Sequence, residues 1–270
     1  MASHDWQLER RAETWVVTAG ILQGVPPVAH AFSTRRAGDA ASDFDLGPAR
    51  QAAPVERKRR RALCHAAGLG DREPLVLEQE HGARAVEAHG GLVAGEAGAG
   101  DALYAIAAHR SPTVLSVRTA DCAPLLLAAE DGSAIAAIHA GWRGAAAGVV
   151  ASTLAALGRA GVPPARLVVA IGPTIGPCCY EVGPEVVRAV AERTRTPAEQ
   201  VAARGRAGRP SLDLTRALGL QLLAAGVPTE RVSVAPWCTA CRSDLFFSYR
   251  RDGVVAGRMM ALIGWRDGLP

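Results

Sequence analysis

Residues 119–144, TADCAPLLLAAEDGSAIAAIHAGWRG, constrain the fold of this chain more than any other segment. Two apolar runs, 125–129 and 134–138, flank the tripeptide Glu130-Asp131-Gly132. An Asp-Gly pair between apolar runs is typical of the tight turn that joins two antiparallel strands. We therefore predict a β-hairpin whose loop is Glu130–Gly132.

This hairpin brings a thiol and an imidazole together at its open end. With the predicted loop, Cys122 lies opposite Ala140, one position from His139. Residues directly opposed on antiparallel strands have Cβ atoms roughly 4.5–5.5 Å apart. Cys122 and His139 can then share a metal ion, or form a dyad in which His139 takes the thiol proton and Cys122 attacks a carbonyl. A buried free cysteine beside a core histidine is the purely structural alternative.

The composition is that of a soluble globular protein, with 270 residues, 49% of them hydrophobic and 21% charged. A net charge of +4 is too small to indicate a nucleic-acid partner, and we interpret the basic run ERKRRR (56–61) as the solvated face of a helix. No segment approaches the ~20 apolar residues of a membrane span, and the N-terminal stretch lacks the apolar core of a signal peptide. These observations predict a cytoplasmic protein with no membrane or nucleic-acid partner.

Strand and helix patterns alternate along the chain without a repeat or a linker-like change in composition, which predicts one α+β domain over residues 1–270. The predicted strands are 15–18, 29–34, 74–79, 102–107, 113–117, 167–171 and 231–237. The predicted helices begin near Pro54 and cover 145–161, 184–194 and 213–225. Residues 245–249 and 258–263 are predicted to form a terminal hairpin.

A second histidine follows one of these predicted strands. The segment PLVLEQ (74–79) leads directly into Glu80-His81-Gly82, so His81 lies just past a strand end. One thiolate and two imidazoles suit zinc or copper, and three protein ligands leave a fourth position open. Arg143 follows His139 at the start of a predicted helix, where a positive side chain and free backbone N–H groups attract anions.

The remaining cysteines give weaker signals. Cys238-x-x-Cys241 is half of a zinc-ribbon pattern, but the chain has no second CxxC pair. Structural thiols are favoured over a redox-active pair, although both interpretations stay open. Cys178 and Cys179 are adjacent and cannot both point into one site from a strand.

Five motifs occur in order along nearly the whole chain. They are LEQEHG (77–82), TADC (119–122), HAGWRG (139–144), IGPTIGPCCYEVG (171–183) and FFSYRRDGVVAGRM (246–259), and STR (33–35) and DLG (45–47) accompany them. Together they resemble the bacterial polyphenol-oxidase/laccase-domain family. That family is also described as purine nucleoside phosphorylase and, in some bacteria, as a peptidoglycan-editing factor.

The resemblance implies mixed β-sheets in an α/β/β/α layered arrangement and a metal centre at His81, Cys122 and His139, which are also the expected catalytic residues. It implies a cytosolic enzyme that splits adenosine, inosine and methylthioadenosine with phosphate into the base and ribose 1-phosphate. Adenosine deamination is also attributed to the family. We expect Arg143 and Arg35 to bind the phosphate or substrate. Glu80 departs from the apolar or small residue usual before the ligand histidine.

Two other functions stay open. The same Cys122 and His139 would serve a cysteine-dependent amidase acting on a serine-substituted muramyl precursor of peptidoglycan. A copper-dependent polyphenol oxidase is less favoured, because a blue-copper site needs an axial methionine and Met259 and Met260 are far from the hairpin in sequence. Zinc is thus the expected metal and copper the alternative, and the sequence makes no prediction of oligomeric state.

Overall fold

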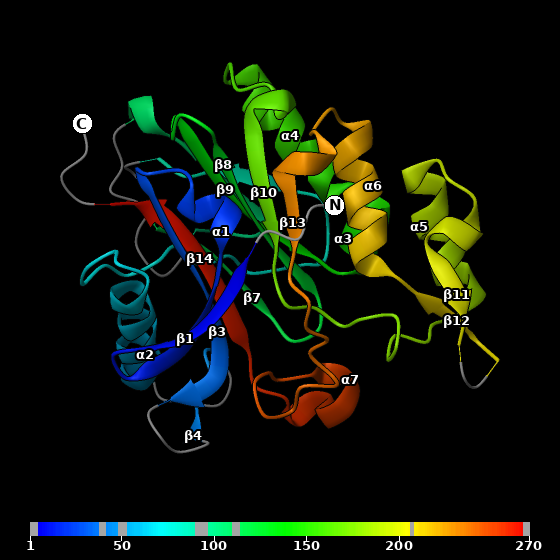
Figure 1. Cartoon of the computed structure of the whole chain (residues 1–270), viewed down its shortest axis with the longest axis horizontal. Helices are drawn as coiled ribbons and strands as arrows, with labels where there is room; N and C mark the ends of the chain where they lie inside the picture. Colours follow the sequence, from blue (N-terminus) through cyan, green and yellow to red (C-terminus); the bar gives the residue numbers. More distant parts are fainter. Residues whose placement is uncertain are drawn as a thin grey trace.

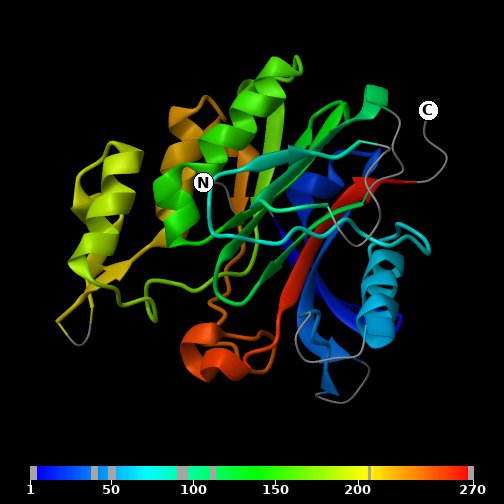
Figure 2. The same cartoon turned by 180° about the vertical axis from the view of Figure 1, so that it is seen from behind.

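The computed structural model describes residues 5–37, 42–47, 53–89, 97–109, 114–205 and 208–266. Two six-stranded sheets pack face to face at its centre, and helices cover their outer faces (Figures 1 and 2). This arrangement confirms the predicted α+β class and its α/β/β/α layers.

The first sheet has the strand order β1-β2-β3-β14-β7, with β4 paired to β3. Its strands are β1 (Trp6–Arg11), β2 (Thr14–Ala19), β3 (Val28–Ala37), β4 (Ser42–Asp43), β7 (Val114–Thr119) and β14 (Met259–Trp265). The second sheet has the order β13-β10-β8-β9-β6-β5. Its strands are β5 (Ala85–Glu87), β6 (Ala102–Ile106), β8 (Ala123–Ala129), β9 (Ala134–Ala140), β10 (Leu167–Ile171) and β13 (Val232–Val234). A separate two-stranded ribbon pairs β11 (Ala202–Arg204) with β12 (Pro210–Leu212).

Helices lie on both sides of the paired sheets (Figures 1 and 2). Helix α2 (Ala53–Ala66) packs on β2 and β3 of the first sheet, and α4 (Val149–Arg159) packs on β9 and β6 of the second. The other helices are α1 (Gly20–Gln23), α3 (Trp142–Ala147), α5 (Pro184–Thr194), α6 (Leu214–Ala224) and α7 (Tyr249–Asp252). Short 3-10 turns occur at Ala107–His109, Pro164–Arg166, Ala198–Gln200, Thr229–Arg231 and Gly253–Val255. None of the described helices is long and apolar enough to cross a bilayer.

The β8–β9 hairpin is the centre of the core, because every residue of both strands is buried. Leu126 and Ile135 face the first sheet, whereas Leu125 and Ile138 face the covering helices. A strand with apolar layers on both faces needs a continuous apolar sequence rather than an alternating one. This burial explains the two apolar runs that predicted the hairpin.

The hairpin is confirmed, but its predicted register is wrong by one residue. Ala123 pairs with Ala140, so Cys122 precedes β8 instead of lying opposite Ala140. The turn is one residue longer than predicted, because Asp131 Oδ1 accepts hydrogen bonds from the N–H and the hydroxyl of Ser133. This Asx-type turn draws Ser133 into the loop.

The predictions of 167–171 and 184–194 match β10 and α5. The strands predicted at 15–18, 29–34, 102–107, 113–117 and 231–237 overlap β2, β3, β6, β7 and β13, although residue 113 lies outside the described residues. The predicted strand 74–79 is wrong, since this segment forms only isolated bridges at Leu75 and Glu78. The edge strand β1, WQLERR, was not predicted, because the alternation of Trp6 and Leu8 with polar residues is short and two arginines follow it.

The predicted terminal hairpin is also wrong. Residues 245–249 form no strand, and β14 pairs instead with β3 and β7, which are far away in the sequence. Phe246 and Phe247 are apolar because they are buried in the core between the sheets. A short apolar run therefore does not distinguish a buried loop from a buried strand, and here it belongs to a buried loop.

The helix predicted over 145–161 is two helices, because Gly148 adopts φ +88° and separates α3 from α4. A side chain at residue 148 would be strained at this φ and would have to displace the Arg193 guanidinium, so glycine is favoured there. Helix α3 therefore has six residues. So short a helix does not support the predicted attraction of anions to its N-terminus. The charge of Arg143 is then the feature of this segment that can attract an anion.

Candidate metal centre

Three side chains from separate parts of the chain converge beside the hairpin. His81 follows an isolated bridge segment, Cys122 lies in the β7–β8 connection, and His139 belongs to β9. Their candidate ligand atoms all lie within 4.8 Å of one another, and the two imidazole rings are 4.8 Å apart in an edge-to-face arrangement. His139 is buried whereas His81 is exposed, so this centre opens to solvent on the His81 side. The structure thus brings together the three residues that the sequence selected.

A buried carboxylate, Asp101, orients two of these residues. Its Oδ1 lies 2.8 Å from His139 Nδ1 and accepts the His81 backbone N–H at 2.9 Å, while its Oδ2 accepts the Gly82 N–H at 2.6 Å. Burial opposes ionisation of Asp101, but these hydrogen bonds outweigh it and the pKa of the carboxyl is lowered. With Nδ1 held by Asp101, His139 keeps Nε2 for a metal or for the Cys122 thiol. Sequence reasoning missed Asp101, since a lone aspartate before β6 belongs to no recognised pattern.

The electrostatics of Cys122 and His139 are coupled. Burial opposes the thiolate, but the charge and hydrogen bonds of His139, with a hydrogen bond from His81, lower the pKa of Cys122. Burial likewise opposes the imidazolium, yet Cys122 and Asp101 raise the pKa of His139. The pair therefore favours thiolate and imidazolium, and a thiolate is both the metal-binding and the nucleophilic form of cysteine.

The backbone around this centre is shaped to admit the three side chains. A Cβ on Gly141 would lie 2.8 Å from Cys122 Sγ and 3.3 Å from His81 Cδ2, so the glycine makes room for both. His81 adopts φ +61°, a left-handed conformation uncommon outside glycine, and its N–H bond to Asp101 secures it. The first glycine of HAGWRG, Gly141, is thus needed because a side chain there would collide with Cys122.

Asp121 fixes the position of the neighbouring Cys122. It adopts φ +91°, which is strained for a residue with a side chain. Its carboxylate accepts hydrogen bonds from the Thr239 hydroxyl at 2.6 Å, the Ser248 hydroxyl at 3.0 Å and the Arg250 backbone N–H at 2.6 Å. Asp121 therefore ties the start of β8 to two segments more than a hundred residues away. Its place in the TADC motif was the only signal of this role.

Two arginines lie on segments that pack against the centre, since Arg143 follows Gly141 by two residues and the Arg250 N–H donates to Asp121, which precedes Cys122. Arg143 is exposed and stacks over the Trp142 ring at 4.5 Å, and Arg250 stacks over the Tyr180 ring at 5.2 Å. Burial and the nearby Cys122 charge raise the pKa of Tyr180, while Arg250 and Arg143 act against that rise. Tyr180 therefore lies within electrostatic range of both Cys122 and Arg143. Sequence reasoning identified Arg143 but missed Tyr180 and Arg250.

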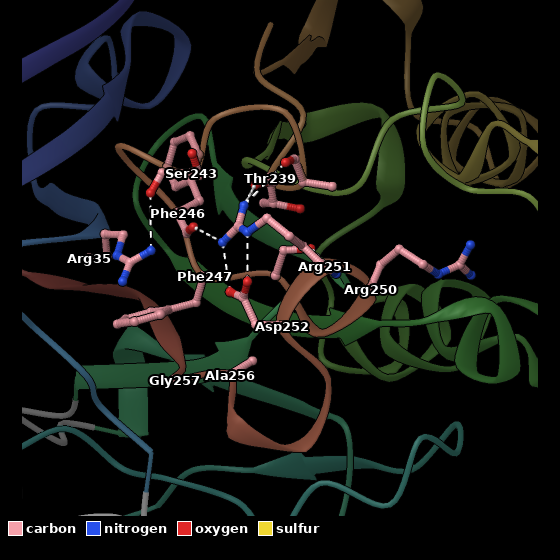
Figure 3. A network of polar contacts seen from close by, with 12 residues as sticks. Arg35, Thr239, Ser243, Phe246, Phe247, Arg250, Arg251, Asp252, Ala256 and Gly257 are labelled. Atoms are coloured by element: carbon pink, nitrogen blue, oxygen red, sulfur yellow. Dashed lines mark hydrogen bonds and ion pairs between the residues drawn. The ribbon is translucent and has the colours of Figure 1, made fainter.

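The other predicted substrate residue, Arg35, lies in a different polar network, shown in Figure 3. Its guanidinium donates to the Ser243 carbonyl at 3.1 Å and stacks over Phe247 at 4.8 Å. Arg251 anchors the same segment through Asp252 and the Phe246 carbonyl. These contacts place Arg35 beside residues 243–252, and its role in substrate binding remains a prediction.

Comparison with known proteins agrees with these observations. Residues 29–266 match the family model described as multi-copper polyphenol oxidoreductase laccase. The chain is 42% identical over 156 residues to purine nucleoside phosphorylase YlmD of Geobacillus stearothermophilus, covering 57% of each chain. It is 35% identical over 145 residues to adenosine deaminase RL5 of an unknown prokaryotic organism, covering 54% of this chain and 55% of that relative. The chain thus spans a little over half the length of these curated relatives in the aligned regions.

The similarity in structure extends further. The crystal structure of YlmD from Geobacillus stearothermophilus superposes with a TM-score of 0.85 at 29% identity, covering 97% of this chain and 100% of that one. The family match over residues 29–266 includes His81, Cys122 and His139. The chain belongs to the multi-copper polyphenol oxidoreductase laccase family, whose relatives include proteins named purine nucleoside phosphorylase and adenosine deaminase.

Proposed function

We propose that this chain is a metal-dependent purine nucleoside phosphorylase acting on adenosine, inosine and methylthioadenosine. In this reaction the bond between C1′ of the ribose and the purine nitrogen breaks and a bond from C1′ to a phosphate oxygen forms. The products are the base and ribose 1-phosphate, or 5-methylthioribose 1-phosphate when the substrate is methylthioadenosine. The proposal depends on one observation, the convergence of His81, Cys122 and His139 with Asp101 behind them. The name of the Geobacillus relative, purine nucleoside phosphorylase, supplies the reaction class.

The donor set fits a transition metal. One thiolate and two imidazoles are ligands that zinc accepts, and Asp101 supplies the outer hydrogen bond that metal-binding histidines usually make. Zinc bound there would act as a Lewis acid toward the substrate or a bound water. The same donors suit copper. Met259 lies closer than its sequence separation indicated, opposite Thr119, but its sulfur already accepts the Phe247 N–H at 3.0 Å. Zinc is therefore our proposed metal.

The protein's own residues would position the second substrate. Phosphate is an anion, and exposed Arg143 lies two residues after Gly141, which packs against Cys122 and His81. Arg250 is less available, because it donates to the Glu181 carbonyl at 2.8 Å and stacks on Tyr180. Arg143 is thus the group we assign to phosphate, while Asp101 holds the His139 proton on Nδ1.

Product analysis tests this function directly. The purified protein is incubated with adenosine with and without phosphate, and its metal content is measured. We expect adenine and ribose 1-phosphate only when phosphate is present, and loss of both products in Cys122→Ala. Inosine formed without phosphate would instead reveal adenosine deamination, the activity named for the second relative. Absence of all these products with the zinc-loaded protein would contradict the proposal.

One observation favours a second function. Cys122, His139 and Asp101 form the series thiol, imidazole and carboxylate that a cysteine amidase uses, and the pKa of Cys122 is lowered as that chemistry requires. A serine-substituted muramyl nucleotide is the substrate to test, with release of the amino acid as the signal. His81→Gln separates the two functions, because it removes a metal ligand while Cys122, His139 and Asp101 remain. Amidase activity that survives His81→Gln and chelation would favour the second function, whereas loss of phosphorolysis in the same variant supports the first.

A further inference from the structure

Four other cysteines, Cys178, Cys179, Cys238 and Cys241, form a second cluster of potential ligands. The first pair lies in the turn between β10 and α5, and the second pair lies in the turn that follows β13. All four sulfurs lie within 4.8 Å of one another. The inference that Cys178 and Cys179 cannot share a site assumed a strand and is wrong, because a turn lets both sulfurs approach Cys241. This pair supplies the half of the zinc-ribbon pattern that the sequence lacked.

The distances between the sulfurs suit a shared ion better than a disulfide. Cys241 Sγ lies 3.6 Å from Cys178 Sγ and 3.4 Å from Cys179 Sγ. A disulfide requires about 2.05 Å. In a tetrahedron with zinc–sulfur bonds of about 2.3 Å, neighbouring sulfurs are about 3.8 Å apart. The two distances to Cys241 are therefore close to the spacing in a tetrathiolate site, and all four sulfurs lie within 4.8 Å of one another. Thiolates are ligands that zinc readily accepts.

The backbone holds these thiols in place. The Gly176 N–H donates to Cys238 Sγ at 3.2 Å, and a Cβ on residue 176 would lie 3.4 Å from Cys178 Sγ and 3.3 Å from Cys238 Cβ. The two turns are also joined by the Thr239 N–H, which donates to the Thr174 carbonyl at 3.0 Å. Cys178 and Cys241 are exposed, so an ion can reach the cluster from solvent.

We propose that Cys178, Cys179, Cys238 and Cys241 bind one zinc ion as a tetrathiolate, separate from the His81 centre. Zinc replaces the thiol protons, which pass to solvent, and no oxidation or reduction occurs. The ion would link the turn that contains Cys178 and Cys179, which follows Thr174, to the turn that contains Thr239. Both hydroxyls donate to Asp121 at 2.6 Å, next to Cys122. The second ion would thereby stabilise the position of Asp121 and of Cys122, a candidate ligand of the first centre.

Counting zinc in matched variants tests this proposal without any assay of activity. The full chain is purified under reducing conditions, equilibrated with zinc, desalted and analysed for metal per chain. We expect two zinc ions in the wild type, one in Cys122→Ala and one in the double variant Cys238→Ser/Cys241→Ser. Cys64→Ala is the matched control, since Cys64 is buried on α2 and belongs to neither cluster, and it should keep two.

Cobalt substitution and alkylation give readouts that do not depend on whether the double variant folds. Cys122→Ala loaded with Co²⁺ should keep the intense sulfur-to-cobalt charge-transfer absorption of a tetrathiolate. In the wild type, zinc should slow alkylation of Cys178 and Cys241 by iodoacetamide at least tenfold, and removal of zinc with a chelator should restore it. Equal alkylation rates with and without zinc, or an as-isolated mass two hydrogens lower that shows a disulfide, would overturn the proposal. Failure of phosphorolysis would leave these readouts unchanged, so the two proposals fail independently.

Discussion

Asp101 and His139 form a buried carboxylate–imidazole pair, with 2.8 Å between Oδ1 and Nδ1. The same carboxylate accepts the backbone N–H groups of His81 and Gly82. The side chain of Asp101, just before β6, therefore orients His81 and His139, which lie 58 residues apart in the sequence. The centre depends on this single outer carboxylate as well as on its three inner residues.

Replacing that carboxylate should weaken metal binding more than it weakens the fold. In Asp101→Asn the amide loses the charge that supports His139, and we expect zinc affinity to fall about 10–100-fold, the usual cost of losing such a partner. Competition titration with a chromophoric chelator measures the change. Asp71→Asn is the control, since Asp71 is an exposed partner of Arg61, and its zinc affinity should match the wild type. An unchanged zinc affinity in Asp101→Asn would show that Asp101 does not support metal binding through His139.

The glycine at position 141 should tolerate no side chain. Gly141→Ala places a methyl group 2.8 Å from Cys122 Sγ, so sulfur or backbone must move. We expect at least a tenfold loss of zinc affinity with a nearly unchanged circular dichroism spectrum. Gly158→Ala in α4 is the matched control, because a Cβ there meets no atom within 4 Å. That control should keep full affinity, and equal zinc binding by the two variants would contradict the packing argument.

Arg143 should affect phosphate more than nucleoside. Charged hydrogen bonds contribute roughly 1.5–3 kcal/mol, so Arg143→Ala should raise the KM for phosphate about tenfold or more. The KM for the nucleoside should change little, and Arg143→Lys should recover part of the effect by restoring the charge. Arg188→Ala on α5 removes another exposed arginine and is the control. Initial rates at varied phosphate measure the effect, and an unchanged phosphate KM would exclude the assignment.

The stability of the fold should fall in weak acid because of His30. Its Nε2 accepts the Ala19 N–H at 2.9 Å, which requires a neutral ring. Burial, and then the charges of Arg11 and Arg266, lower the pKa of His30 to about 3. Between that value and the ordinary value of 6.5, the unfolded chain binds a proton that the folded chain does not. The free energy of unfolding should therefore decrease as the pH falls through this window, by up to about 1.4 kcal/mol per pH unit from this group.

Denaturant titrations at several pH values measure this effect. His30→Gln keeps a hydrogen-bond acceptor but cannot titrate. Its free energy of unfolding should therefore rise relative to that of the wild type as the pH falls from 6.5 toward 4. His65→Gln removes an exposed histidine on α2 and should follow the wild type. Parallel pH curves for the wild type and His30→Gln would show that His30 does not contribute.

The sequence by itself determined the elements whose signals are local. The apolar runs around Asp131-Gly132 predicted the central hairpin, and β10 and α5 matched their predicted bounds. Turn chemistry, apolar continuity and helix-ending residues act over a few residues, which is why these elements can be read without a structure. Cys122 and His139 come together because Cys122 immediately precedes β8 and His139 lies on β9, its partner in the hairpin.

Only the tertiary structure decided which distant segments meet. The pairing of β14 with β3 and β7, the approach of Asp101 to His139 and the joining of Cys178 and Cys179 to Cys241 all link parts of the chain remote in sequence. Such contacts depend on how two sheets and their turns pack, and no local pattern encodes that packing. His81 combines both cases. Its place after a predicted strand and the motif resemblance selected it, and the packing of its loop against Asp101 brings it to the centre.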